Sequence, residues 1–424
     1  MDTIFALSSG QPPAGIGVIR VTGPAVRDVL QTVIGTIPEP RRATHATFRN
    51  VSRETLDDGL ALFFPGPASV TGEDLAEFHC HGGRAVVAAI NAALSEIDGC
   101  RSAEPGEFTR RAFANGRIDL AEAEGLGDLL SAETELQRRS ALAMAGGTLS
   151  RKAEGWREAL LGLSAQVEAV LDFEDEDDVA ELSPDFREGL TALHRDLMET
   201  LQAPHAETLR EGYRVALAGP PNAGKSTLFN ALVDSEAAIT AEIAGTTRDV
   251  LTRSVAIRGV PFTFVDMAGL RAAGADTVEA IGISRAHEEI VRADLVLWLG
   301  PEGEGPSDSL EIEAQVDRPE RTRKTAPWLR VSAVSGDGLD ALRAALVTQA
   351  RESMPKPGEA ALNDRQRSRI TEASHAVERA GEVSDPLLVA ENLREARRAF
   401  DALVGRTDTE DVLDAIFGRF CIGK

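Results

Sequence analysis

The chain has 424 residues, of which 43% are hydrophobic and 27% charged, and its formal net charge is −23. This length allows two or three domains, each with its own core. The acidic excess argues against a surface that coats nucleic acid broadly, and the 4% aromatic content argues against stacking platforms for single strands. Widely spaced cysteines, the lack of a bilayer-length apolar run and an N-terminus without a basic leader predict a cytoplasmic protein with no membrane segment.

The first segment, residues 1–117, alternates short strand-like runs with turns and contains one helix-compatible stretch, Ala85–Glu96. This pattern predicts a compact α+β domain. The sequence His79-Cys80-His81 has metal-ligating residue types. Side chains alternate along a strand, however, so the two histidines would share one face while Cys80 points away, and no second ligand pair is evident. Ordinary strand packing is therefore favoured over a zinc site.

Residues 118–210 and 351–424 carry apolar side chains at helical spacing. Pro184, directly after Ser183, is typical of a helix start. Because both stretches flank an α/β module, we expect them to pack together as one discontinuous all-α domain, with residues 211–350 inserted between them. The predicted fold class is multidomain. The apolar stripes consist of Trp156, Leu160, Leu163, Val167, Val170, Leu171, Phe186, Leu190, Leu193, Leu197, Leu201, Val389, Leu393, Ala396, Phe400 and Leu403.

The inserted module opens with a strand-like run, Arg214–Ala218, followed by Gly219-Pro-Pro-Asn-Ala-Gly224-Lys225-Ser226 and an apolar-periodic helix. This is the phosphate-binding pattern GxxxxGK[ST] in its required strand–loop–helix setting. Backbone N–H groups at the helix N-terminus suit a phosphate, Lys225 would contact the β- and γ-phosphates, and Ser226 would bind Mg²⁺. The sequence therefore predicts a nucleoside-triphosphate site.

Downstream segments indicate a GTPase. Thr247 stands in a polar loop, where its oxygen could reach Mg²⁺ as the loop closes over the γ-phosphate. Asp266 follows a strand-like run and opens Asp-Met-Ala-Gly269; it would hold Mg²⁺ through water, and the Gly269 N–H would contact the γ-phosphate. The next residue, Leu270, cannot orient an attacking water, so another group must do so.

The base-reading part departs from the usual GTPase pattern. Guanine is commonly read by NKxD, but the corresponding sequence here is Ala314-Gln315-Val316-Asp317, which keeps only the aspartate. The preceding connection, Pro301–Asp308, is too short for the usual crossover helix. Ser332-Ala333 could still supply a guanine contact. Guanine is thus the expected base, with weakened selectivity.

Short motifs are spread over essentially the whole chain. They are GVIRVTG (Gly17–Gly23), TGED (Thr71–Asp74), HGG (His81–Gly83), PGEF (Pro105–Phe108), PNAGKST, IAGTTRD, DMAGLR and CIGK (Cys421–Lys424). Their order and the terminal CIGK are specific together. With these motifs the chain resembles the family of tRNA modification GTPases called MnmE or TrmE.

The resemblance implies that residues 1–117 form a domain that dimerises and binds a tetrahydrofolate derivative. This derivative would be 5-formyl- or methylene-tetrahydrofolate. By position, the implied folate contacts are Arg20, Glu77, Arg117 and Lys424. Basic side chains suit the glutamate tail of folate, and a carboxylate can pair with the N–H edge of the pterin. The terminal Cys421 is implied to lie near this site and is a candidate catalytic residue of the modification.

For the inserted domain, the resemblance implies that K⁺ replaces an arginine finger by stabilising developing charge. Its implied ligands are Asn222, Ala241, Ile243 and Thr246, and Glu279 takes the position of the acid that orients water. Mg²⁺ is assigned to Ser226 and Thr247. The full set of predicted GTP-binding residues is Asn222, Ala223, Gly224, Lys225, Ser226, Thr227, Ala241, Ile243, Thr246, Thr247, Asp266, Gly269, Asp317, Ser332 and Ala333.

The implied activity is K⁺-stimulated GTP hydrolysis coupled to modification of tRNA. A homodimer would join an FAD-dependent, MnmG-like partner in a heterotetramer that adds an aminomethyl or carboxymethylaminomethyl group to carbon five of the wobble uridine. The alternatives are a regulatory GTPase switch and a folate-binding scaffold whose GTPase domain has lost turnover. Intact Lys225, Thr247, Asp266 and Glu279 argue against the scaffold.

Overall fold

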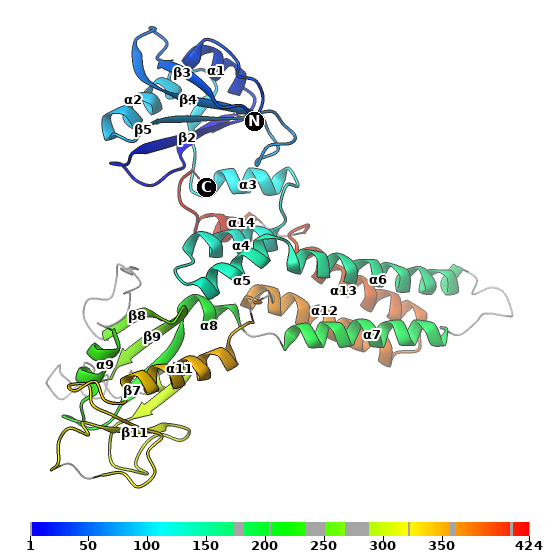
Figure 1. Cartoon of the computed structure of the whole chain (residues 1–424). Helices are drawn as coiled ribbons and strands as arrows, with labels where there is room; N and C mark the ends of the chain where they lie inside the picture. The colour runs from blue at the N-terminus through cyan, green and yellow to red at the C-terminus, as the bar shows by residue number, and fades with distance from the viewer. Residues whose placement is uncertain are drawn as a thin grey trace, which may run out of the picture. The chain divides into compact units, whose positions relative to one another are not determined.

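The computed structural model of the chain describes residues 2–172, 182–202, 205–233, 251–267, 288–320, 323–356, 361–407 and 410–423. The chain divides into two compact units, one of residues 1–127 with 401–424 and the other of residues 128–400 (Figure 1). Each unit contains a six-stranded sheet. None of the described helices has both the length and the apolar character needed to cross a bilayer.

The sheet of the first unit has the strand order β3-β4-β5-β2-β1-β6, and every pairing is antiparallel except the parallel β1–β6 edge. Antiparallel sheets commonly pack one face on a core and leave polar groups on the other. The strand-rich α+β fold predicted for residues 1–117 is confirmed. The strands are β1 (Thr3–Leu7), β2 (Ile16–Thr22), β3 (Thr44–Arg49), β4 (Thr55–Phe64), β5 (Leu75–His81) and β6 (Cys100–Ser102).

Helices α1 (Val26–Ile34) and α2 (Arg84–Ser95) cover one face of this sheet and share its main core. On the other face, Phe108 of α3 (Glu107–Ala114) packs with Ile4 and Ala6 of β1. A smaller apolar cluster joins α4 (Leu120–Ser131) to α14 (Glu410–Phe417). The chain's last helix thus belongs to the same unit as its first strands.

The helical part of the second unit is built from two stretches far apart in sequence (Figure 1). Trp156 of α6 stacks on Phe400 of α13 with ring centroids 5.7 Å apart, and α7 packs along α12. Ser183 caps α7 and Pro184 occupies its first turn, as predicted. The discontinuous helical domain is confirmed. Its helices are α5 (Glu135–Ala145), α6 (Thr148–Asp172), α7 (Pro184–Leu201), α12 (Asp364–Glu382) and α13 (Pro386–Leu403).

The nucleotide-binding module has the strand order β12-β11-β10-β7-β9-β8, with only β8–β9 antiparallel. Helices α9 and α11 pack against one face of the sheet. Residues 299–309, all described, form no helix, yet β10 and β11 pair in parallel, so the missing crossover helix is confirmed. The elements are α8 (Ala206–Glu211), β7 (Tyr213–Ala218), α9 (Lys225–Val233), β8 (Leu251–Ile257), β9 (Val260–Asp266), β10 (Leu295–Trp298), β11 (Leu310–Ala314), β12 (Leu329–Val331) and α11 (Leu339–Ser353).

Candidate functional site

The phosphate-binding loop follows the central strand β7 and leads directly into α9. β7 lies between β10 and β9, the point where the order of parallel strands reverses and where ligands bind in open α/β sheets. Gly219 and Gly224 have φ of 148° and 97°, and Asn222 has φ of 61°. Such left-handed geometry is the reason for glycine at the loop's two ends.

Lys225 begins α9 and is buried, with 6% of its surface exposed. Its ammonium donates to the carbonyl oxygens of Gly219 at 2.9 Å and Pro220 at 2.8 Å. The side chain therefore folds back across the loop, where a compact positive charge can meet phosphate oxygens.

Ser226 and Asp266 meet at the same end of the sheet. The Ser226 hydroxyl donates to Asp266 Oδ2 at 2.6 Å, and Asp266 is only 1% exposed. Asp266 ends β9, which runs parallel to β7 and pairs with it through Leu217. A hydroxyl and a carboxylate in contact beside a phosphate-binding loop are suitable Mg²⁺ ligands, directly or through water.

The predicted base-reading residues come together at the other end of this site. The Ser332 hydroxyl donates to Asp317 Oδ1 at 2.6 Å. This hydrogen bond lowers the pKa of the Asp317 carboxyl. A hollow beside α9 is lined by Gly224, Thr227, Leu228, Ala314, Gln315, Asp317, Arg318, Val331, Ala333 and Val334. Residues predicted from both the loop and the later strands thus surround one space.

Gln315 takes part in this site in a way that the sequence did not reveal. It has φ of 59° and lies against the phosphate-binding loop, because a Cβ added to Gly224 would be 3.0 Å from its Nε2. Its side-chain oxygen is buried and has no hydrogen-bond partner in the part of the chain that the structure describes. The amide therefore stands where NKxD has its lysine, in contact with the loop.

A second unforeseen feature is the ion cluster on the sheet face opposite α9 and α11. Ile312 of β11 faces the main core, so its neighbours Glu311 and Glu313 point to the other face. Glu313 is 4% exposed and accepts from Arg323 at 2.9 Å and Arg330 at 2.8 Å. The buried ammonium of Lys324 pairs with Glu311 in the same way. The alternation of Leu310, Ile312 and Ala314 with glutamates was the available signal.

Seven predicted site residues lie outside the described residues and stay predictions. They include the K⁺ loop, the acid assigned to orient water and the terminal lysine. They are Ala241, Ile243, Thr246, Thr247, Gly269, Glu279 and Lys424.

In the first unit, Arg20 and Glu77 lie opposite each other on neighbouring strands β2 and β5. Arg20 Nε donates to Glu77 Oε1 at 2.8 Å, and His79 Nε2 lies 3.3 Å from Glu77 Oε2. Burial alone would raise the pKa of Glu77, but the hydrogen bonds from Arg20 and His79 outweigh it and lower the pKa. Ala6 of β1 lies opposite Arg20, so this pair shares the face on which α3 packs. Cys80 is buried on the other side of β5, as predicted.

The C-terminal segment reaches the end of β1. Ile422 forms an antiparallel bridge with Pro105, and the Ser8 hydroxyl donates to the Gly423 carbonyl at 2.8 Å. Gly423 fits tightly there, since a Cβ would come within 2.3 Å of the Leu7 carbonyl oxygen. Cys421, just before this contact, is exposed.

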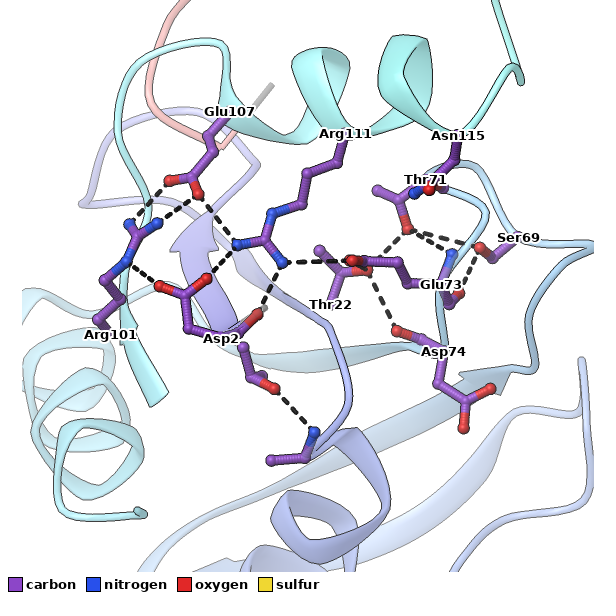
Figure 2. A network of polar contacts seen from close by, with 12 residues as sticks. Asp2, Thr22, Ser69, Thr71, Glu73, Asp74, Arg101, Glu107, Arg111 and Asn115 are labelled. Atoms are coloured by element: carbon purple, nitrogen blue, oxygen red, sulfur yellow. Dashed lines mark hydrogen bonds and ion pairs between the residues drawn. The ribbon is translucent and has the colours of Figure 1, made fainter. Parts of the chain in front are cut away.

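A polar network holds α3 and the loop before β5 in place (Figure 2). The largely buried Arg111 guanidinium binds Asp2 Oδ1 at 2.8 Å, Glu107 at 3.0 Å and Glu73 at 3.2 Å. Asn115 donates to the Thr71 carbonyl at 2.7 Å. The exposed Arg117 comes two residues later, beside the same loop. This network therefore fixes the backbone from which Arg117 extends.

Comparison with known proteins agrees with these features. Residues 3–117 match the family model described as GTP-binding protein TrmE N-terminus, and residues 120–421 match the MnmE helical domain. Relatives named tRNA modification GTPase MnmE from Novosphingobium aromaticivorans and Erythrobacter litoralis are 60% and 58% identical, with 100% of both chains covered.

A solved G domain of the Thermotoga maritima FeoB iron transporter is 24% identical and covers 32% of this chain and 98% of its own, but its TM-score of 0.24 is too low to carry an argument. The family models and the full-length relatives suffice: the chain belongs to the MnmE family of tRNA modification GTPases.

Proposed function

We propose that the chain is a GTPase that uses Mg²⁺, is stimulated by K⁺, and takes part in modifying the wobble uridine of tRNA with a one-carbon unit from tetrahydrofolate. It would act as a homodimer with an FAD-dependent, MnmG-like partner. The observation that carries the GTPase part is the 2.6 Å contact between Ser226 and Asp266 beside the Lys225 ammonium. These groups have the chemistry and the placement of a phosphate and Mg²⁺ site.

Each described group has a distinct task in this proposal. Lys225 balances the charge of the transferred phosphoryl group, and Ser226 with Asp266 holds the metal ion that bridges the phosphates. Asp317, anchored by Ser332, has a second oxygen with which to accept the guanine N–H donors. K⁺ bound through Asn222 would add positive charge where an arginine finger otherwise acts. GTP hydrolysis would drive conformational change and not the carbon chemistry.

The folate part of the proposal rests on the Arg20–Glu77 pair and on the C-terminal segment held at β1. The guanidinium can bind a glutamate-tail carboxylate, and the carboxylate can accept from the pterin edge. The side chains of Arg20 and Glu77 face the side of the sheet that carries α3. Arg117 and Lys424 would supply further positive charge. The exposed thiol of Cys421 lies in the segment that reaches this strand.

The GTPase proposal is tested by hydrolysis of GTP and ATP in K⁺ and in Na⁺, for the wild type and Asp317→Ala. We expect faster GTP than ATP hydrolysis, stimulation by K⁺, and loss of the base preference in the variant, because its edge contact is gone. Equal rates for both nucleotides in both salts would contradict the proposal.

The folate proposal is tested by titrating 5-formyl-tetrahydrofolate into wild type, Arg20→Ala and Arg27→Ala. Arg27 is the matched control, because it pairs with Asp74 at the same 2.8 Å but extends from α1, on the opposite face. We expect Arg20→Ala alone to weaken binding about tenfold or more. Loss of wobble modification on gene deletion would separate this enzyme from a purely regulatory GTPase.

A further inference from the structure

The two connections between the nucleotide-binding module and the helical bundle lie side by side. α8 leads from the bundle into β7, the strand before the phosphate-binding loop, and α12 starts the return. His205 and Leu362 form a parallel bridge, in which the Ala206 N–H donates to the Leu362 carbonyl at 3.0 Å. Side chains from the entering and leaving chains are thereby brought together.

Three of these side chains are of metal-ligating types. His205, Glu207 and Asp364 each offer one ligand atom, and these atoms all lie within 4.8 Å of one another. His205 Nδ1 is 4.0 Å from Asp364 Oδ1, and Glu207 Oε1 accepts from the Asp364 N–H at 3.1 Å. An imidazole with two carboxylates is a ligand set used for zinc.

Glu207 supplies an independent reason to expect a cation. Its second oxygen, Oε2, is buried and has no hydrogen-bond partner among the described residues. A buried carboxylate oxygen without a donor is unfavourable unless a positive charge or a hydrogen bond reaches it. Asp364, whose own N–H binds Glu207, adds a second negative charge beside it.

We propose that His205, Glu207 and Asp364 form a site for a divalent metal ion of the Zn²⁺ type, which ties the entering and leaving connections together. Imidazole favours Zn²⁺ and similar transition metals over Mg²⁺, which prefers six oxygen ligands. The site is separate from the predicted Mg²⁺ position at Ser226. Nothing in the proposed GTPase chemistry depends on it.

The geometry allows this binding with small side-chain movements. Bonds of about 2.0–2.2 Å place neighbouring ligand atoms of a tetrahedral zinc site roughly 3.3–3.6 Å apart. The side chains of His205 and Asp364 are 56% and 81% exposed, so they can rotate to close the 4.0 Å gap. The two backbones are better fixed, because Asn363 and Gln366 form a buried capping box beside Asp364, and His205 is held in the bridge to Leu362.

The test is a titration of Zn²⁺ into full-length, chelator-treated, nucleotide-free protein, with bound metal counted after gel filtration. The variants are His205→Ala and Asp364→Asn. Matched controls are His375→Ala, an exposed histidine on α12, and Asp185→Asn, an exposed acid in the first turn of α7. We expect wild type and controls to bind one Zn²⁺ more than the two variants, with Mg²⁺ unable to compete. Equal stoichiometry in all five proteins would overturn the proposal.

A second readout separates metal binding from a purely structural role. Zn²⁺ should raise the unfolding temperature of wild type but not of the variants, because a ligand that binds only the folded state stabilises it. Glu207→Gln should make the metal-free protein at least as stable as wild type, since the neutral amide can donate to Asp364, and should remove the response to Zn²⁺. A variant that is less stable without metal yet keeps the Zn²⁺ response would contradict the assignment.

Discussion

At the phosphate end of the nucleotide-binding module, Lys225 donates to two carbonyls of its own loop, whereas at the base end the buried Glu313 is held by arginines from two other positions. The first arrangement follows from the backbone, since glycine geometry and the start of α9 place the ammonium. The second depends on side chains that meet only after β11 and β12 have paired. The phosphate end is therefore determined by a local sequence motif, whereas the base end is held together by tertiary contacts.

The base end also shows what replaces a missing helix. A crossover helix would cover the face of β10 and β11 opposite α9 with apolar side chains. Here that face carries Glu311 and Glu313, which pair with Lys324, Arg323 and Arg330. A sheet face without a helix must satisfy or solvate its polar groups, and ion pairs do so here. The base end should therefore respond to charge changes that leave the phosphate end intact.

The largest effect is expected from replacing Lys225, and the similarly buried Lys324 serves as its control. Lys225→Ala should lower kcat/KM for GTP at least ~100-fold, about 3 kcal/mol, because it removes a charge that acts on the transferred phosphate. Lys324→Ala, which removes a lysine that binds Glu311 and the Trp298 carbonyl, should lower the unfolding temperature but leave turnover at 25 °C within a few-fold. If both variants lost turnover equally without unfolding, the two ends would not be separable.

The difference between the phosphate end and the base end also explains which parts of the site could be predicted from the sequence. Strand, loop and helix around Lys225 follow from local patterns, and the Ser226–Asp266 contact follows from the rule that parallel strands end at one edge. Gln315 was visible only as a departure from NKxD. Its left-handed backbone and its packing on Gly224 depend on how β11 meets α9, which no local pattern encodes.

The same limit holds for the first unit. The alternation that predicts β2 and β5 also places Arg20 and Glu77 on one face, but only pairing in register brings them opposite each other. Arg111 could not have been identified, because its partners come from the N-terminus, from the loop before β5 and from its own helix (Figure 2). Networks of this kind are assembled by tertiary structure.

A somewhat smaller effect is expected from the ion cluster. Arg323→Ala with Arg330→Ala should destabilise the module by about 3 kcal/mol, because Glu313 stays buried without a counter-charge, and adding Glu313→Leu should restore most of this loss. The chain has three tryptophans. In a Trp156→Phe background, the fluorescence of Trp298 and Trp328 reports unfolding of the module alone. A triple variant no more stable than the double one would show that the cluster is not what holds this face.

The cluster also sets a pH dependence. Burial alone would raise the pKa of Glu313, but hydrogen bonds from Arg330 and Arg323 outweigh it and lower the pKa. A carboxyl with a lowered folded pKa stabilises the protein above its unfolded pKa, about 4.3, and this contribution is lost as the pH falls through the folded pKa. The stability of the wild-type module should therefore decline more steeply below pH 5 than that of the triple variant, by the same fluorescence measurement.

The smallest effect concerns the contact with the base. Gln315→Lys should tighten binding of both GTP and ATP by about fivefold, near 1 kcal/mol, because a lysine stem can pack on the face of either purine and its ammonium adds a cation–π contribution. The change also removes the buried amide oxygen, for which the described residues offer no hydrogen-bond partner. Since a face contact does not distinguish purines, the ratio of the two affinities should stay constant. Asp317→Ala should instead weaken GTP binding alone, because Asp317 reads the edge of the base. Fluorescent GTP and ATP analogues measure both quantities, and a ratio that changes with Gln315→Lys would show that Gln315 itself selects the base.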